Sequence, residues 1–235
     1  KDQQLEQTDH RLPFRARPGC ERVCGVLAGI YIWSFRQDHA IQSPDRAIRR
    51  DAAALRYHLY KTVVMVGMMG AGKTAVGTAL ARLLGVPFRD TDAAIQEAAD
   101  RSIAEIFARD GEVFFRRKEG QVLERLLSER PGILSTGGGA FLAERNRSLI
   151  SCRGCSVWLK VDLPLLWARV RHKNTRPLLQ TADPQATLRE LHDKRVPAYE
   201  QADLTVPVGP NSSIEDTAHL VVEALLDRPD VLVKR

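Results

Sequence analysis

The sequence predicts an α/β fold of three layers, in which helices cover both faces of a central parallel sheet of five strands. Short runs rich in β-branched residues alternate with segments of helical periodicity from about residue 61 onward. The first of these runs, residues 62–66, leads into a glycine-rich loop and then a helical pattern. Strands that alternate with helices are joined by crossovers, which makes neighbouring strands parallel and buries both faces of the sheet.

Five segments have the composition of buried strands, and they lie at residues 62–66, 87–90, 132–136, 156–161 and 204–208. Helical patterns fall between them. Residues 75–84 carry apolar side chains on one side of a helix. Ser102 and Glu105 form a capping-box pattern that begins another helix. Residues 112–127 repeat apolar residues at helical spacing, and Asp162 precedes a further helix start.

Composition and charge narrow the classes of function. The 235 residues are 44% hydrophobic and 27% charged, as is ordinary for a globular protein with a sizeable core. The formal net charge of +6 favours an anionic partner, such as a phosphate or a carboxylate. We expect no nucleic-acid partner, because blocks of basic residues mixed with aromatic residues are missing. The apolar run at residues 26–33 is shorter than the roughly 20 residues that span a bilayer, so we expect a cytoplasmic protein without a membrane partner. We also expect a monomer.

The chain divides into two parts of different character. Residues 1–60 lack sustained periodicity, and we expect an extension of unknown structure, either disordered or with a helical appendage around residues 44–59. Residues 61–235 carry the regular alternation and are expected to form one catalytic domain. The sequence assigns no chemistry to the extension.

The four cysteines fall into two local pairs, Cys20 with Cys24 and Cys152 with Cys155. The second pair has the CxxC spacing of redox and zinc sites. Cys155, however, opens an apolar run that is predicted to be a buried strand, and free cysteine is common in protein cores. We therefore expect a core cysteine, with a zinc site shared by both pairs as the alternative.

Residues 67–74 read GMMGAGKT and fit the pattern GxxxxGK[ST] directly after a strand and at the start of a helix. Glycines let backbone N–H groups curl around phosphate oxygens, and the helix N-terminus adds partial positive charge. Lys73 is expected to reach the β- and γ-phosphates of ATP, and the Thr74 hydroxyl is expected to bind Mg²⁺. The expected ATP-binding residues of this loop are Gly70, Ala71, Gly72, Lys73, Thr74 and Ala75.

Two carboxylates follow the second strand, at Asp90 and Asp92. The carboxyl ends of parallel strands are where ligands collect in such folds. One carboxylate can orient water on Mg²⁺ while the other accepts a proton from an attacking hydroxyl. The alternative for Asp90 is a structural one, as the cap of the following helix.

Five ordered motifs make the pattern more specific, and they are DTD at residues 90–92, SIAEIF at 102–107, GEVFFRRKE at 111–119, STGGGA at 135–140 and RPLL at 176–179. Their order and spacing resemble those of the shikimate kinases over about residues 61–210. The resemblance implies a P-loop fold like that of the nucleoside-monophosphate kinases. It also implies transfer of a phosphoryl group from ATP to the 3-hydroxyl of shikimate, with Mg²⁺ as the cofactor.

The resemblance assigns roles to individual residues. Asp92 would hold the hydroxyl that is phosphorylated and serve as its candidate base, and Asp90 would help to hold Mg²⁺ through water. Arg116 would pair with the shikimate carboxylate, a role that suits the bidentate guanidinium, and Glu119 lies one helical turn away to hold it. The other expected substrate contacts are Phe107, Phe115, Gly138, Gly139 and Arg195.

The polar and basic segment at residues 169–183 resembles the mobile lid of these kinases. Arg176 would enter the site when the lid closes and stabilise charge on the transferring group. Arg171 would contact the adenine or the phosphates. Arg195 stands in a segment, residues 194–199, that resembles the Arg-x-Pro-x-Tyr element of the family and would supply the second arginine for the carboxylate.

Two other functions fit parts of the pattern. Another P-loop kinase of small metabolites, such as a gluconate kinase, would share the phosphate loop but would not need Arg116, Arg195 and the three glycines. A catalytically silent module of the same fold would be expected to have lost the lysine, the aspartate or the arginines, and all of them are present.

Overall fold

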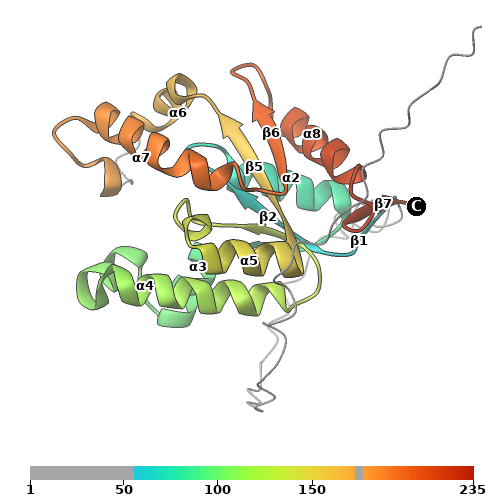
Figure 1. Ribbon diagram of the computed structural model, residues 1–235, viewed down its shortest axis with the longest axis horizontal. Helices are drawn as coiled ribbons and strands as arrows, with labels where there is room; N and C mark the ends of the chain where they lie inside the picture. Colours follow the sequence, from blue (N-terminus) through green and yellow to red (C-terminus); the bar gives the residue numbers. More distant parts are fainter. Residues whose placement is uncertain (1–55, 173–176) are drawn as a thin grey trace, which may run out of the picture. The chain divides into compact units, whose positions relative to one another are not determined.

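The structure, a computed structural model, describes residues 56–172 and 177–235. Five strands form a parallel sheet in the order β3-β4-β2-β5-β6, which confirms the predicted fold class. Figure 1 labels three neighbouring strands of this sheet, β2, β5 and β6. Its strands are β2 (Thr62–Val66), β3 (Phe88–Asp90), β4 (Ile133–Ser135), β5 (Gly154–Val161) and β6 (Leu204–Val208). All five lie within two residues of their predicted bounds at each end.

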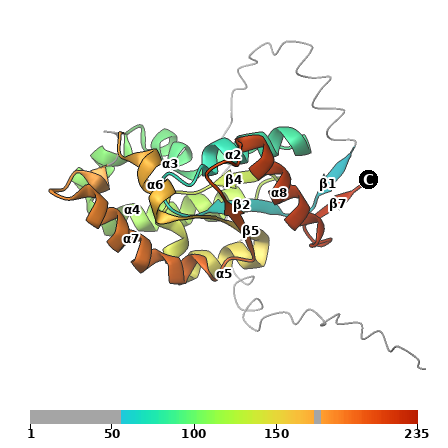
Figure 2. The same cartoon turned by 90° about the horizontal axis from the view of Figure 1, so that it is seen from above.

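Helices cover both faces of this sheet. Figure 2 shows α2 and α8 on one face and α5 on the opposite face. The helical elements are α2 (Lys73–Leu84), α3 (Thr91–Ala99), α4 (Ile103–Leu127), η2 (Ala140–Leu142), α5 (Glu144–Arg153), α6 (Leu163–Val170), η3 (Pro177–Leu179), α7 (Pro184–Tyr199) and α8 (Ile214–Leu226). The β2 side chains are buried along the whole strand, as expected for a central strand covered on both faces.

Helix α4 combines two segments that the sequence predicts separately. Its start at Ser102 has the predicted capping box, in which Glu105 N–H donates to the Ser102 hydroxyl at 3.3 Å and Ser102 N–H donates to the Glu105 carboxylate at 2.7 Å. Gly111 interrupts the helical backbone with a φ of 78°, just before the predicted second segment. The break lets two helical stretches of different direction run on as one element.

A second, smaller core lies beside the main one and joins α3 to α4. It consists of Ile95, Ile106 and Phe115, with Phe107 packed against it. The two phenylalanine rings lie 4.6 Å apart between centroids. This small core packs α3 against α4.

Residues 57–59 and 232–234 form a second sheet, which the sequence did not predict. β1 (Tyr57–Leu59) pairs antiparallel with β7 (Leu232–Lys234), and the N–H of Tyr60 donates to the carbonyl of Val231 at 2.8 Å. Residues 57–59 are therefore a strand rather than the end of a helical appendage. The folded unit also includes residues before the predicted boundary at residue 61. The remainder of the expected extension lies outside the described residues.

Two expectations about the cysteines and the membrane can be compared with the described residues. Cys155 is fully buried in β5, as predicted, and burial raises the pKa of its thiol to about 12. Within the described ranges no group of three or more His, Cys, Asp and Glu side chains could hold a metal ion. In the same ranges no helix has both the length and the apolar character needed to cross a membrane. Cys20 and Cys24 lie outside them.

The β1–β7 pair predicts where the stable domain begins. A chain that starts at residue 61 lacks Leu59, which is buried, and leaves β7 without its partner. We expect it to be less stable by about 2 kcal/mol than a chain that starts at residue 56, since burial of one leucine side chain contributes about that much. Urea denaturation of the two chains measures the difference. Equal midpoints would show that β1 contributes nothing to the domain.

Candidate active site

The loop at residues 67–74 leaves β2 at its carboxyl end and turns directly into α2. Two of its glycines adopt backbone conformations that other residues rarely take, with a φ of 83° at Gly70 and 95° at Gly72. A Cβ at Gly70 would also lie 2.7 Å from a methyl group of Val170 on α6. These glycines therefore allow the curved conformation of the loop, and the N-terminus of α2 faces into the curve.

The Lys73 ammonium lies within the curve of this loop. It donates hydrogen bonds to the carbonyl oxygens of Gly67 at 2.9 Å and Met68 at 3.0 Å. A guanidinium joins the same loop from α6, where Arg169 donates to the carbonyl of Gly70 at 3.3 Å. Two cations thus surround a loop built to bind phosphate oxygens.

Oxygen atoms from the ends of β3 and β4 meet a hydroxyl oxygen in the first turn of α2. The Thr74 hydroxyl lies 3.4 Å from Asp90 Oδ2 and 3.3 Å from Ser135 Oγ. The other oxygen of Asp90 caps α3, since it accepts from the N–H of Asp92 at 2.9 Å and that of Ala93 at 3.3 Å. Asp90 thus has the capping role considered as the alternative, and its second oxygen remains beside Thr74. Hydroxyl and carboxylate oxygens are ligands that Mg²⁺ accepts.

The three glycines at 137–139 follow β4 and contact, in turn, the residues expected to bind substrate. A Cβ at Gly137 would lie 2.8 Å from Asp92 Oδ1, and one at Gly138 would lie 3.3 Å from an Arg195 terminal nitrogen. At Gly139 it would lie 2.6 Å from both terminal nitrogens of Arg116. Three charged side chains from α3, α7 and α4 thus approach one stretch of backbone that has no side chains of its own.

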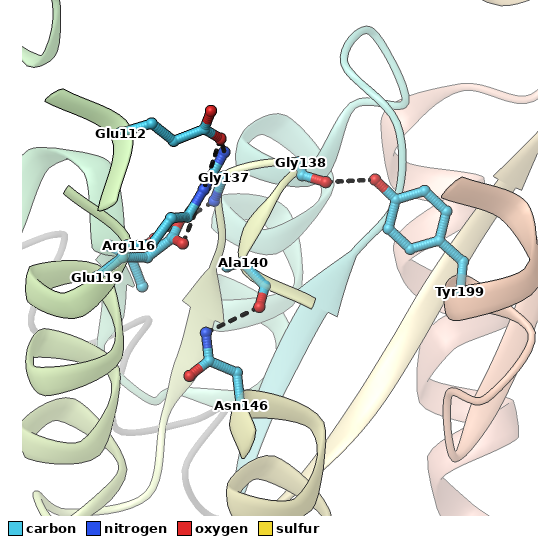
Figure 3. A network of polar contacts seen from close by, with 9 residues as sticks. Glu112, Arg116, Glu119, Gly137, Gly138, Ala140, Asn146 and Tyr199 are labelled. Carbon is cyan, nitrogen blue, oxygen red and sulfur yellow. Dashed lines mark hydrogen bonds and ion pairs between the residues drawn. The ribbon is translucent and has the colours of Figure 1, made fainter. Parts of the chain in front are cut away.

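Arg116 is held in place by carboxylates on its own helix. It donates to both oxygens of Glu119, at 2.9 and 3.2 Å, and to Glu112 at 3.2 Å (Figure 3). Glu119 is 1% exposed, and burial raises the pKa of its carboxyl although the Arg116 charge opposes that rise. The predicted contact between these residues is confirmed. The guanidinium also lies 5.3 Å from the centroid of the Phe115 ring.

Arg195 and Tyr199 lie one turn apart on α7, and both are buried. The Tyr199 hydroxyl donates to the carbonyl of Gly138 at 2.5 Å. Burial raises the pKa of Tyr199 to about 12, and the neighbouring Arg195 opposes the rise. Arg195 is 7% exposed, so its charge lies inside the protein beside the glycine stretch.

Some expected site residues are not brought into this group. Arg171 is exposed and follows directly after α6, where its backbone N–H donates to the carbonyl of Trp167. Arg176 lies outside the described residues. Phe115 is buried in the small core, whereas Phe107 is half-buried beside it.

Sequence reasoning missed two residues at the site, Arg169 and Tyr199. Both stand in segments that it selected, the basic segment from residue 169 and the element at residues 194–199. For Arg169 the sequence gave only its place at the start of that basic segment. Tyr199 gave the signal of a phenol one turn after an arginine.

The Arg116–Glu119 pair predicts a stability that depends on pH. Arg116→Ala removes the charge that holds down the pKa of Glu119, so the folded-state pKa lies further above the unfolded value of about 4.3. The stability that the protonated Glu119 carboxyl contributes is fully present below the pKa of Glu119 in the unfolded chain. It is lost as the pH rises through the pKa of Glu119 in the folded chain. We expect the variant to lose about 1–3 kcal/mol at pH 8 and less at pH 5.

Adding Glu119→Gln to Arg116→Ala provides the control, because it removes the buried carboxylate. Urea denaturation at pH 5 and pH 8 should then show stability recovered at the higher pH. A loss of equal size at both pH values that persists in the double variant would contradict the buried-charge explanation.

Comparisons with known proteins show which family the chain resembles. The family model described as shikimate kinase matches residues 69–226. A shikimate kinase of Ruegeria pomeroyi is 64% identical over 174 residues, which are 74% of this chain and 89% of that protein. A shikimate kinase of Cereibacter sphaeroides is 62% identical over 187 residues, 80% of this chain and 94% of its own length.

A solved structure also matches. The shikimate kinase of Acinetobacter baumannii in complex with shikimate has a TM-score of 0.66 and 38% identity, and the match covers 71% of this chain and 93% of that one. The shikimate kinase structure from Bacteroides thetaiotaomicron has a TM-score of 0.65 and 32% identity, with 70% and 98% covered. By its sequence, its sheet and its phosphate loop, the chain belongs to the shikimate kinase family.

Proposed function

We propose that this chain transfers the γ-phosphoryl group of ATP to the 3-hydroxyl of shikimate and releases shikimate 3-phosphate. The observation that carries the proposal is the contact of three consecutive glycines with Asp92, Arg195 and Arg116, beside a phosphate loop. A carboxylated polyol needs paired cations for its carboxylate and a polar group for the reacting hydroxyl. The family membership supports the same substrate.

Shikimate would bind with its carboxylate between Arg116 and Arg195. Both guanidinium groups approach adjacent residues of the glycine stretch, Gly138 and Gly139, whose Cα atoms are about 3.8 Å apart. The N–H groups of that stretch would add donors to the ring hydroxyls. Phe107, half-buried, would contact the ring, and the buried Phe115 would support Phe107 from behind.

ATP would bind with its phosphates in the loop from Gly70 to Thr74, where backbone N–H groups, Lys73 and the start of α2 would surround them. The expected contacts are Gly70, Ala71, Gly72, Lys73, Thr74 and Ala75. Arg169, which already contacts this loop, would assist at the nucleotide. Arg171 and Arg176 are further candidates from the sequence alone.

The oxygen set of Thr74, Asp90 and Ser135 suits Mg²⁺, which binds few protein oxygens and completes its shell with water and phosphate. We propose that Thr74 binds the ion directly and that Asp90 binds it through water. When bound, Mg²⁺ supplies positive charge to the phosphate oxygens.

Asp92 would orient the 3-hydroxyl and accept its proton as the hydroxyl oxygen bonds to phosphorus and the bond to ADP breaks. Its carboxylate lies against Gly137, at the strand end next to the phosphate loop. Lys73 and Arg176 would stabilise the charge on the transferring group. Positioning and charge stabilisation supply most of the rate enhancement in phosphoryl transfer.

We further propose that the chain acts as a cytoplasmic monomer, without a nucleic-acid or membrane partner. The residues assigned to both substrates belong to one chain, which supports a complete site in a single copy. Residues from about 57 onward would carry the activity.

The first test is release of ADP from MgATP with shikimate, with gluconate and with no acceptor. We expect strong stimulation by shikimate alone. Stimulation by gluconate would reject the acceptor and keep the phosphate loop. Binding of ATP without stimulation by either would favour a catalytically silent module.

Lys73→Met should reduce turnover by about 100-fold or more, because a cation at the transferring phosphate is lost. Lys234→Met, at an exposed position of β7, is the matched control and should leave turnover unchanged. Steady-state kinetics and urea denaturation measure both chains. Normal turnover in Lys73→Met would remove the lysine from the mechanism.

Gly139→Ala should raise the KM for shikimate by about tenfold and leave that for ATP unchanged. The added methyl group would lie 2.6 Å from the Arg116 nitrogens, and Glu119 holds Arg116 from its other side. Loss of one hydrogen bond to a charged group has about that effect. Gly209→Ala, whose Cβ would make an ordinary 3.5 Å contact, is the control. A raised KM for ATP alone would contradict the assignment of Arg116.

A further inference from the structure

The glycine stretch is anchored at both of its ends. The hydroxyl of Thr91 accepts from the N–H of Gly137 at 3.4 Å, and Ala140 N–H donates to the Gly137 carbonyl at 3.1 Å. On the far side, the amide of Asn146 donates to the Ala140 carbonyl at 2.9 Å (Figure 3). The peptide between Gly138 and Gly139 lies between these anchors, flanked by residues with the lowest barrier to backbone rotation.

That peptide is contacted by Tyr199. The phenol donates to the Gly138 carbonyl at 2.5 Å, and the two groups point toward each other in Figure 3. Tyr199 is fully buried, and its pKa of about 12 keeps it protonated, and so a donor, at any pH suited to an assay. The contact is therefore a permanent feature of the folded protein rather than one that changes with pH.

The orientation of one carbonyl fixes the orientation of the next N–H. In a planar trans peptide the C=O and N–H groups point in opposite directions. When the Gly138 carbonyl points to Tyr199, the N–H of Gly139 must point to the other side of the stretch. Gly139 lies against Arg116, so in the proposed binding mode this N–H would be one of the donors to the acceptor.

The tyrosine ring is itself held in place. It stacks on Trp158 of β5, with the ring centroids 6.1 Å apart and the planes 29° apart. Trp158 in turn lies against Gly67, where an added Cβ would be 3.3 Å from the indole Cδ1 atom. Tyr199 thus connects the glycine stretch to the central sheet and to the residue whose carbonyl accepts from Lys73.

From these contacts we infer that Tyr199 is a positioning residue, whose hydroxyl prevents the Gly138–Gly139 peptide from flipping and so directs the Gly139 N–H toward the acceptor. The inference rests on the proposed function for the identity of the acceptor. The hydrogen bond that holds the peptide does not depend on the proposed function, because it exists without any ligand. Tyr199 itself touches neither the reacting hydroxyl nor the phosphate in this assignment.

Tyr199→Phe tests the inference because it keeps the ring and its stacking and removes only the hydroxyl. We expect the KM for shikimate to rise by about five- to thirtyfold and the KM for ATP to stay within about twofold of the parent value. Tyr57→Phe, in β1 and remote from the site, is the matched control and should change neither constant. Unchanged KM values in Tyr199→Phe would overturn the inference. Equal rises in both KM values, together with a lower urea midpoint, would overturn it too, because they indicate a structural role.

A second measurement needs no substrate. Hydrogen–deuterium exchange of the full chain without ligands should be faster in Tyr199→Phe at residues 137–142 and unchanged in β2 and β5. Exchange equal to that of the parent chain would overturn the inference that Tyr199 holds this peptide in place. If the parent chain fails to phosphorylate shikimate, the proposed function falls, yet this exchange result still decides whether Tyr199 fixes the peptide.

Discussion

The site depends on a stretch of backbone with no side chains. Asp92, Arg195 and Arg116 come from three different helices, and each approaches one of three consecutive glycines within 3.3 Å of where a Cβ would stand. A side chain at any of these positions would move a charged group away from the site. The charged residues and the glycines are therefore one structural unit, and changing either alters the other.

Charge balance explains how two arginines remain close together. Arg116 is paired with the buried Glu119, whereas Arg195 is buried beside the neutral Tyr199. The Arg116 charge is thus paired within the protein, and the Arg195 charge lies beside a neutral phenol. An anionic ligand placed between the two guanidinium groups would interact with both charges, so the arrangement favours a carboxylate over a neutral sugar.

Most of the sheet could be predicted from sequence because short β-rich runs alternate with helical patterns from residue 61 onward. β2 and β6 have the predicted bounds. β1 and β7 could not be found in this way, since each has three residues and gains its stability only from a partner more than 170 positions away. Local pattern also separated the two parts of α4, because Gly111 breaks the backbone without ending the element.

Local sequence patterns also predicted part of the site, as they did for the strands of the sheet. Loop chemistry identified Lys73 and Thr74, and the helical spacing of Arg116 and Glu119 gave their contact. Arg169 and Tyr199 act through backbone carbonyls, and no residue pattern shows which carbonyl a side chain will reach once the chain has folded.

The pairing of Tyr57 with Lys234 brings the two ends of the described part of the chain together. Lys61, which follows β1, leads into the amino end of β2, whereas the phosphate loop leaves its carboxyl end. The ends therefore meet away from the loop. A short peptide could join residue 235 to residue 56 in a circularly permuted chain, with new ends opened in an exposed turn elsewhere, and the order of elements around the phosphate loop would survive.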